Sequence, residues 1–261
     1  MDSKKGYNKK VEAMLSELPD PASLGPAELR VIEDILKADK HDFRPNSIQS
    51  VVLGTFILWV CWLFFNAGST AKMAQLDGAE PSLIMMNTII GGSAGGFCSV
   101  FLKHPIAGTY SSRNKYDVGA LCNGILIGLV SITAGCNNIE PWAALVIGAS
   151  ASIIYGLSTR LMLKLKIDDP LEASQVHGFG GIWGVFVVGF FDRDEGIFYG
   201  ADGDQLAIQI SGILAITAWA IFWSGAFFMA LKLIKRFRVP LIFEIVGLDY
   251  VEHGGSVASR P

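Results

Sequence analysis

The sequence is short of charged residues, and the shortage is concentrated in particular segments. Asp, Glu, Lys and Arg make up 17% of the 261 residues, against roughly a quarter in soluble domains. The first 46 residues are polar, whereas the rest holds six stretches with no charged side chain. These stretches are Pro45–Ala71, Pro81–Leu102, Val118–Ile139, Pro141–Thr159, Ala173–Phe191 and Gln205–Leu231. Such a distribution excludes a single soluble domain. The net charge of -3 also gives no reason to expect a nucleic-acid partner.

Motifs for catalysis or for cofactor binding are absent from the sequence. It has no HExxH motif and no phosphate-binding glycine loop, and the long apolar stretches contain no pair of carboxylates. The cysteines show no CxxC spacing, and we interpret them as small buried hydrophobic residues. They are Cys61, Cys98, Cys122 and Cys136. We therefore expect no enzyme activity, no metal site and no cofactor.

Each charge-free stretch is long enough to cross a bilayer. About 20 apolar residues span a hydrocarbon core of about 30 Å as a helix, and lipid cannot satisfy the backbone groups of any open structure. We therefore predict an all-α integral membrane protein with six transmembrane helices in residues 47–232. The preceding tail, residues 1–46, contains a short amphipathic pattern at Pro26–Ala38, expected to lie on the membrane surface or on a partner. A second polar tail occupies residues 233–261.

The positive charges predict the orientation. An even number of helices places both tails on one side, and nineteen of the Lys and Arg residues fall in the tails and loops of that side. The opposite side has only Lys72 and Arg193. Because positive residues favour the cytosolic side, both termini should face the cytosol or its equivalent. The pattern does not decide between the plasma membrane and the mitochondrial inner membrane.

One ionisable side chain other than cysteine lies well inside a predicted span. His177 follows Asp169 by eight residues, about 12 Å along a helix. Asp169 suits a helix N-cap, Pro170 the first helical position, and Glu172 would complete a capping box. An ionisable residue at membrane depth is a candidate functional residue, although a structural hydrogen bond explains His177 equally well.

A second group of candidates lies on the first span. Trp62, Phe65 and Ser69 recur at helical spacing, so they share one face, with Ser69 at the outer end. A hydroxyl next to an aromatic ring suits a small cation that is losing water, because a cation–π contact offsets part of the desolvation. Core packing is the alternative explanation for such an aromatic stripe.

Four segments together resemble the ammonium transporter (Amt/Rh) family. Their sequences are LGTFILWVCWLFFNAGST (Leu53–Thr70), CNGILIGLVSITAGCNNIEPWAALVIG (Cys122–Gly148), DDPLEASQVHGFGGIWG (Asp168–Gly184) and GLDYVEHGG (Gly247–Gly255). They are similar to the family's sixth, eighth to ninth and tenth helices and to its cytosolic tail. The resemblance runs from about residue 48 to 257.

The resemblance implies one half of the family fold, namely one five-helix repeat plus the final helix. It implies that Ser69 belongs to an outer cation site, that Phe65 is one of two gate phenylalanines, and that Trp62 lies near the pore wall. His177 would be one of two pore histidines. Family members form trimers with one pore in each subunit.

The family's first repeat, with the second histidine and the second phenylalanine, falls outside the resemblance. One hypothesis is a split transporter that moves ammonium or ammonia when a partner chain supplies that half. A second is a non-transporting structural subunit of a large membrane complex, for instance a respiratory or organellar one. A third is ammonium sensing through the segment Gly247–Gly255.

Overall fold

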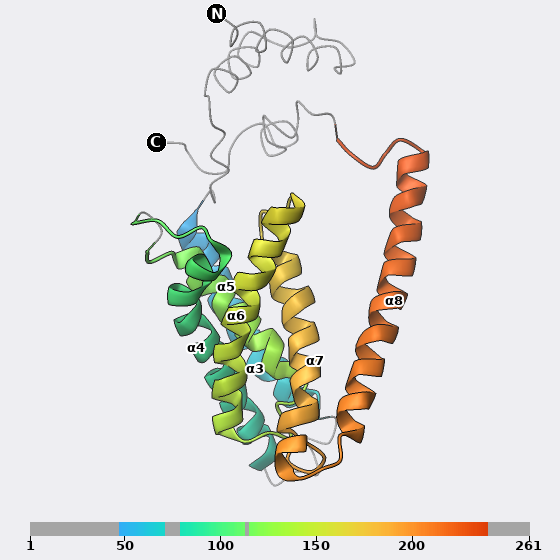
Figure 1. Ribbon diagram of the computed structural model, residues 1–261. Coiled ribbons are helices and arrows are strands. Elements are labelled where there is room, and N and C mark those ends of the chain that lie inside the picture. The colour runs from blue at the N-terminus through green and yellow to red at the C-terminus, as the bar shows by residue number, and fades with distance from the viewer. Residues whose placement is uncertain (1–46, 71–78, 113–114, 240–261) are drawn as a thin grey trace, which may run out of the picture. The chain divides into compact units, whose positions relative to one another are not determined.

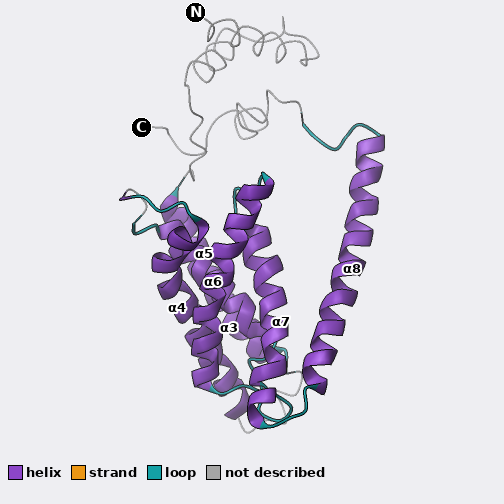
Figure 2. Cartoon of the chain, viewed as in Figure 1, coloured by secondary structure: helices purple, strands orange, loops and turns teal. Residues whose placement is uncertain are grey.

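The computed structural model describes residues 47–70, 79–112 and 115–239, and every regular element in these ranges is helical (Figure 2). Figure 1 labels the α-helices in chain order. Their bounds are α3 Ile48–Gly68, α4 Ala79–Ala107, α5 Val118–Thr133, α6 Pro141–Leu165, α7 Gly180–Phe191 and α8 Asp204–Leu233. A π-helix, η4 (Ser174–Phe179), leads directly into α7, and a 3-10 turn, η5 (Ile197–Tyr199), precedes α8. The predicted all-α fold is confirmed.

Five of the helical segments are long and apolar enough to cross a membrane, with η4 and α7 counted as one. The remaining helix, α5, is apolar but has only 16 residues. The charge-free stretch extended to Ile139, yet the helix ends at Thr133 and a turn follows. Gly135, Asn137 and Asn138 favour such a turn over a continued helix.

The bundle is built around α4, which packs mainly against α5 and α6. Glycines permit this close approach, as the spacing of Gly91 and Gly95 predicts. A Cβ atom on Gly95 would lie 2.5 Å from the carbonyl oxygen of Gly124 on α5. A Cβ atom on Gly148 of α6 would collide with the carbonyl oxygen of Gly91. The three backbones are therefore in direct contact.

A small buried cluster joins η4 to the bundle. Val176 packs with Ile127 of α5 and with Ala151 and Tyr155 of α6, and each of these side chains is almost fully buried. This contact holds one side of the π-helix against the bundle.

The packing described above lies within one compact unit, Ser47–Trp219. A second unit contains Ala220–Pro261 together with Met1–Asn46. Two predicted features, the amphipathic helix at Pro26–Ala38 and the tail motif at Gly247–Gly255, lie outside the described residues.

Candidate functional site

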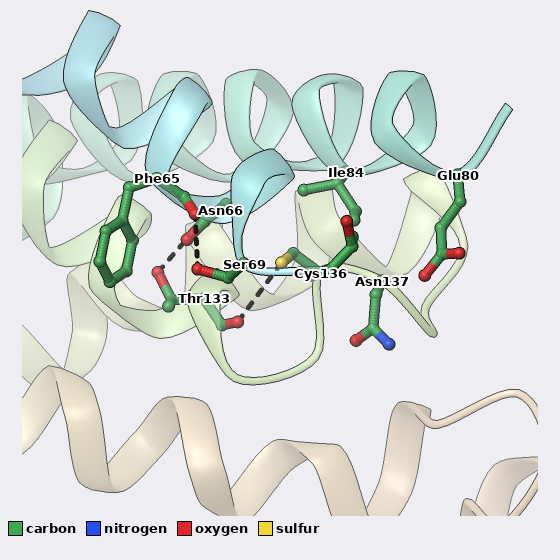
Figure 3. A pocket seen from close by; sticks show the side chains of 9 residues that line it. Phe65, Asn66, Ser69, Glu80, Ile84, Thr133, Cys136 and Asn137 are labelled. Carbon is green, nitrogen blue, oxygen red and sulfur yellow. Dashed lines mark hydrogen bonds between the residues drawn. The ribbon is translucent and has the colours of Figure 1, made fainter. Parts of the chain in front are cut away.

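A cavity of about 410 Å³ opens where α3 ends, α4 begins and α5 ends (Figure 3). The end of α3 contributes two lining residues and the two residues just after Gly68 contribute two more, while α4 and α5 contribute the ends that adjoin them. The lining residues are Phe65, Asn66, Ser69, Thr70, Glu80, Ile84, Thr133, Cys136 and Asn137. Two of the candidates from the sequence, Phe65 and Ser69, therefore share one cavity.

Ser69 presents an acceptor to this cavity. Its Oγ donates to the carbonyl oxygen of Phe65 at 2.6 Å, one helical turn earlier. A hydroxyl has one donor and two acceptor positions. Because the proton is directed at the backbone, the oxygen is left to accept a hydrogen bond from a donor such as an ammonium N–H. The Phe65 ring beside it is 64% exposed, so its face is available for a cation.

Trp62 is half-buried and supports the cavity from outside its lining. Its indole Nε1 donates to Thr133 Oγ1 at 2.7 Å, and Asn66 Nδ2 lies 3.5 Å from the same oxygen. Thr133 in turn donates to the carbonyl oxygen of Leu129. The hydroxyl of Thr133 is therefore fully used in tying α3 to α5, and Trp62 fixes the cavity wall.

Three further lining residues were not singled out by the sequence. Glu80 provides the one formally charged side chain among the lining residues, Asn137 an amide, and Cys136 a thiol whose Sγ donates to the carbonyl oxygen of Thr133. Glu80 lies just outside a charge-free stretch, and the two others lie in the turn after α5. Only the early end of α5, which the sequence did not predict, brings them to the cavity.

His177 lies apart from the cavity lining, in the π-helix η4. The residue is exposed, and its ring makes no hydrogen bond with the residues that the structure describes. The adjoining Gly178 also faces open space, since nothing lies within 4 Å of a Cβ built there. One side of η4 is thus packed through Val176, while the side with His177 is uncovered. Single π-helical turns are frequent at functional sites.

Asp169 lies at the start of this segment, where its carboxylate accepts hydrogen bonds from the backbone N–H groups of Ala173 (3.0 Å) and Ser174 (2.8 Å). Partial burial alone would raise its pKa, but the hydrogen bonds from Ser174, Ala173 and Glu172 lower the pKa below the usual aspartate value. The expected capping box is wrong in two respects. Pro170 lies in a turn and not at the first helical position, because the helical segment begins only at Ala173. The Glu172 carboxylate turns away from the cap and pairs with Lys103.

Within residues 47–70, 79–112 and 115–239, no group of three or more His, Cys, Asp or Glu side chains is placed to hold a metal ion. The chemistry of the cavity is instead that of a polar site with one carboxylate, amides, hydroxyls and an aromatic face. These groups suit a small cation that donates hydrogen bonds.

Comparison with known proteins identifies relatives of this chain. Residues 24–258 match the Ammonium Transporter Family. Ammonium transporter 1 member 4 of Arabidopsis thaliana is 36% identical over 237 residues, which cover 81% of this chain and 46% of that protein. Ammonium transporter 3 of Dictyostelium discoideum is 33% identical over 228 residues, covering 81% of this chain and 50% of that protein.

Solved structures show the same likeness. A protein described as Sensor Amt Protein has 32% sequence identity and a TM-score of 0.68, covering 79% of this chain and 49% of that one. Candida albicans Mep2 has 26% identity and a TM-score of 0.67, covering 78% and 45%. The chain spans about half the length of the curated relatives it matches. On its sequence and its fold, this chain belongs to the ammonium transporter family.

Proposed function

We propose that this chain moves ammonium or ammonia across a membrane once a partner chain supplies the other repeat of the family fold. The observation that supports this most directly is the shared cavity of Phe65 and Ser69 at the end of α3. In this proposal the cavity receives the cation, and His177 acts deeper along the path.

The cavity offers an ammonium ion three kinds of interaction. The Ser69 oxygen accepts a hydrogen bond, the exposed Phe65 ring offers a cation–π contact, and the Glu80 carboxylate supplies a negative charge. Cation–π contacts stabilise a cation by about 0.5–2 kcal/mol. A hydrogen bond to a charged group contributes about 1.5–3 kcal/mol. Together these terms offset part of the cost of removing water from the ion.

Two exposed candidate residues are the reason for proposing a partner chain. The His177 side and the Phe65 ring are uncovered in this chain. An ionisable side chain facing lipid at membrane depth is costly, and such residues face a bundle interior or a water-filled space. A partner bearing the family's first repeat would enclose both residues in a pore. In keeping with the charge distribution, we place the cavity on the outer side and both termini on the cytosolic or equivalent side of a plasma or mitochondrial inner membrane.

Reconstitution into liposomes tests this function. The chain, purified together with the membrane proteins that bind it, should carry an ammonium-dependent flux that His177→Ala abolishes. Ser69→Ala should raise the half-saturating ammonium concentration about 10-fold or more, by loss of one hydrogen bond to a charged group. Ser211→Ala is the matched control, because Ser211 Oγ also donates to a carbonyl one turn earlier, that of Ala207, but lies outside the cavity lining.

An absence of ammonium flux in the complex, with the partner chain present, would contradict the proposal. One observation favours the alternative, a non-transporting structural subunit of a larger respiratory or organellar assembly. His177 has no hydrogen-bond partner among the described residues, so the described part of the chain does not form a complete relay. In that case His177→Ala would leave the function of the assembly unchanged, whereas loss of the whole chain would reduce its abundance.

A further inference from the structure

Glu172 has an unusual backbone conformation directly before the π-helix. Its φ is +56°, in the left-handed region that non-glycine residues rarely adopt. Among the described residues two others share this property, Lys166 and Lys235. Both lysines follow the C-terminus of a helix, where left-handed residues are common. Glu172 instead precedes a helical segment, so its conformation needs a separate explanation.

The side chain of Glu172 explains this backbone conformation, because residues of three helices bind its carboxylate. Lys103 Nζ of α4 lies 2.9 Å from Oε1 and 3.1 Å from Oε2. Asn123 Nδ2 of α5 donates to Oε2 at 3.1 Å. On α6, the Tyr155 hydroxyl donates to Oε2 and Thr159 Oγ1 lies 3.5 Å from Oε1. These bonds use both carboxylate oxygens, so the group acts as an anchor and leaves no acceptor for a ligand.

The anchor is largely removed from solvent. The side chains of Lys103 and Glu172 are 9% and 18% exposed, and Tyr155 is fully buried. The Lys103 ammonium also lies 5.2 Å from the centre of the Tyr155 ring. A buried ion pair is weak evidence for stability, since apolar residues of similar size often stabilise a fold as well. We therefore interpret the Lys103–Glu172 pair as fixing the position of the segment that follows Glu172.

The backbone connects this anchor to His177. The carbonyl oxygen of Glu172 accepts the hydrogen bond of the Val176 N–H at 3.0 Å, an α-type bond that ties Glu172 to the first residues of η4. Val176 is buried, and the next residue, His177, faces the uncovered side. Rotation or axial movement at Glu172 would thus be transmitted to the imidazole through one turn of helix.

We propose that Glu172 is a positioning residue for His177, held by Lys103, Asn123 and Tyr155 so that the imidazole keeps a fixed depth and direction on the pore-facing side. The inference rests on the proposed function, because it assigns His177 to the ammonium path. Glu172 itself does not contact the transported species.

The test measures the position of residue 177 directly. In full-length chain bearing His177→Cys, in membranes, the rate of modification of residue 177 by a water-soluble thiol reagent is measured by mass spectrometry of its peptide. Glu172→Gln keeps the shape of the side chain but removes the charge pair, and Lys103→Met removes the partner. We expect each to change the modification rate at least 10-fold, in the same direction.

The control is Asp192→Asn, at the other end of α7. Asp192 is also an acid with several bonds, accepting from Asn138 Nδ2 at 2.8 Å and from the N–H groups of Asp194 and Glu195. Its loss should lower the melting temperature without changing the modification rate at residue 177. If Glu172→Gln and Lys103→Met lower the melting temperature but leave that rate unchanged, the proposal is overturned.

Flux measurements separate the two proposals. With His177 intact in the transporting complex, Glu172→Gln should lower the maximal flux per folded molecule at least 5-fold while the half-saturating ammonium concentration stays the same. If the wild-type complex carries no flux but the modification rate still responds to Glu172→Gln, the transport function is wrong and the positioning role stands.

Discussion

At the scale of single residues, the cavity wall depends on the hydroxyl of Thr133. This oxygen accepts from Trp62 and lies near the Asn66 amide, so it joins α3 to α5. Neither contact was foreseeable from the sequence, because the partners are far apart along the chain. The sequence did predict that Phe65 and Ser69 share a face, because helical spacing alone fixes that relation.

Trp62→Phe tests the importance of this link. Loss of the indole N–H should lower the free energy of unfolding by about 1 kcal/mol and raise the half-saturating ammonium concentration a few-fold, because the wall beside Ser69 loosens. The measurements are thermal unfolding in detergent and flux in liposomes. Trp59→Phe is the matched control on the same helix, since no described residue accepts a hydrogen bond from Trp59. Equal effects of the two substitutions would contradict this prediction.

Asp117 gives the protein a pH-dependent contact at the start of α5. It caps α5 through Gly119 N–H at 2.8 Å and bonds to His104 Nε2 at 2.9 Å. Partial burial acts to raise its pKa, but the bonds from His104 and Gly119 and the charge of Lys103 lower the pKa below its usual value. The stabilisation is therefore present above the usual aspartate pKa of about 3.9 and is lost as the pH falls through the lower folded value.

Asp117→Asn should preserve the cap, because Asn caps almost as well as Asp, while removing the negative partner of His104. At about pH 5 we expect a melting temperature lower than that of wild type by about 2–4 °C for each kcal/mol lost. The difference from wild type should shrink below about pH 4. Thermal unfolding measured between about pH 5 and about pH 3 checks the prediction, and a difference that fails to shrink over this range would contradict it.

At the scale of the helices, the absence of charge located the spans well and their ends less well. The charge-free stretch Pro81–Leu102 predicts that the span ends before Lys103, yet α4 continues to Ala107. The helix continues because Glu172 provides a buried partner for the lysine. The π-helix was not predicted either, since the charge-free stretch Ala173–Phe191 indicated only a helix of ordinary type.

The glycine contacts among α4, α5 and α6 predict that two glycine-to-alanine substitutions change stability in opposite directions. Gly148→Ala places a Cβ atom against the Gly91 carbonyl and should destabilise the protein by about 1–3 kcal/mol through forced backbone shifts. Gly54→Ala, on α3, meets nothing within 4 Å and should stabilise its helix by about 0.5–1 kcal/mol. Thermal unfolding of the two variants measures both. If Gly148→Ala were as stable as wild type, the close approach would be wrong.

At the scale of the whole molecule, the uncovered side of α3 and η4 is the feature that needs explanation. A photo-activated apolar reagent dissolved in the lipid should label Ser174–Phe179 in the isolated chain. In the transporting complex the labelling should fall at least five-fold, because the proposed partner chain would cover His177. The labelled peptides are quantified by mass spectrometry. Unchanged labelling in the complex would show that this side faces lipid and would contradict the enclosed pore.

The short helix α5 has an electrical consequence. Its 16 residues measure about 24 Å, against about 30 Å for the hydrocarbon core, so a polar turn and a cavity replace the last part of the span. In the proposed orientation, the membrane potential would fall mainly across the remaining thickness, beyond Ser69. An ion resting at Ser69 would have crossed little of that potential. In the proposed path, binding in the cavity should therefore be almost independent of voltage, while a step that carries the charge past His177 should depend on voltage.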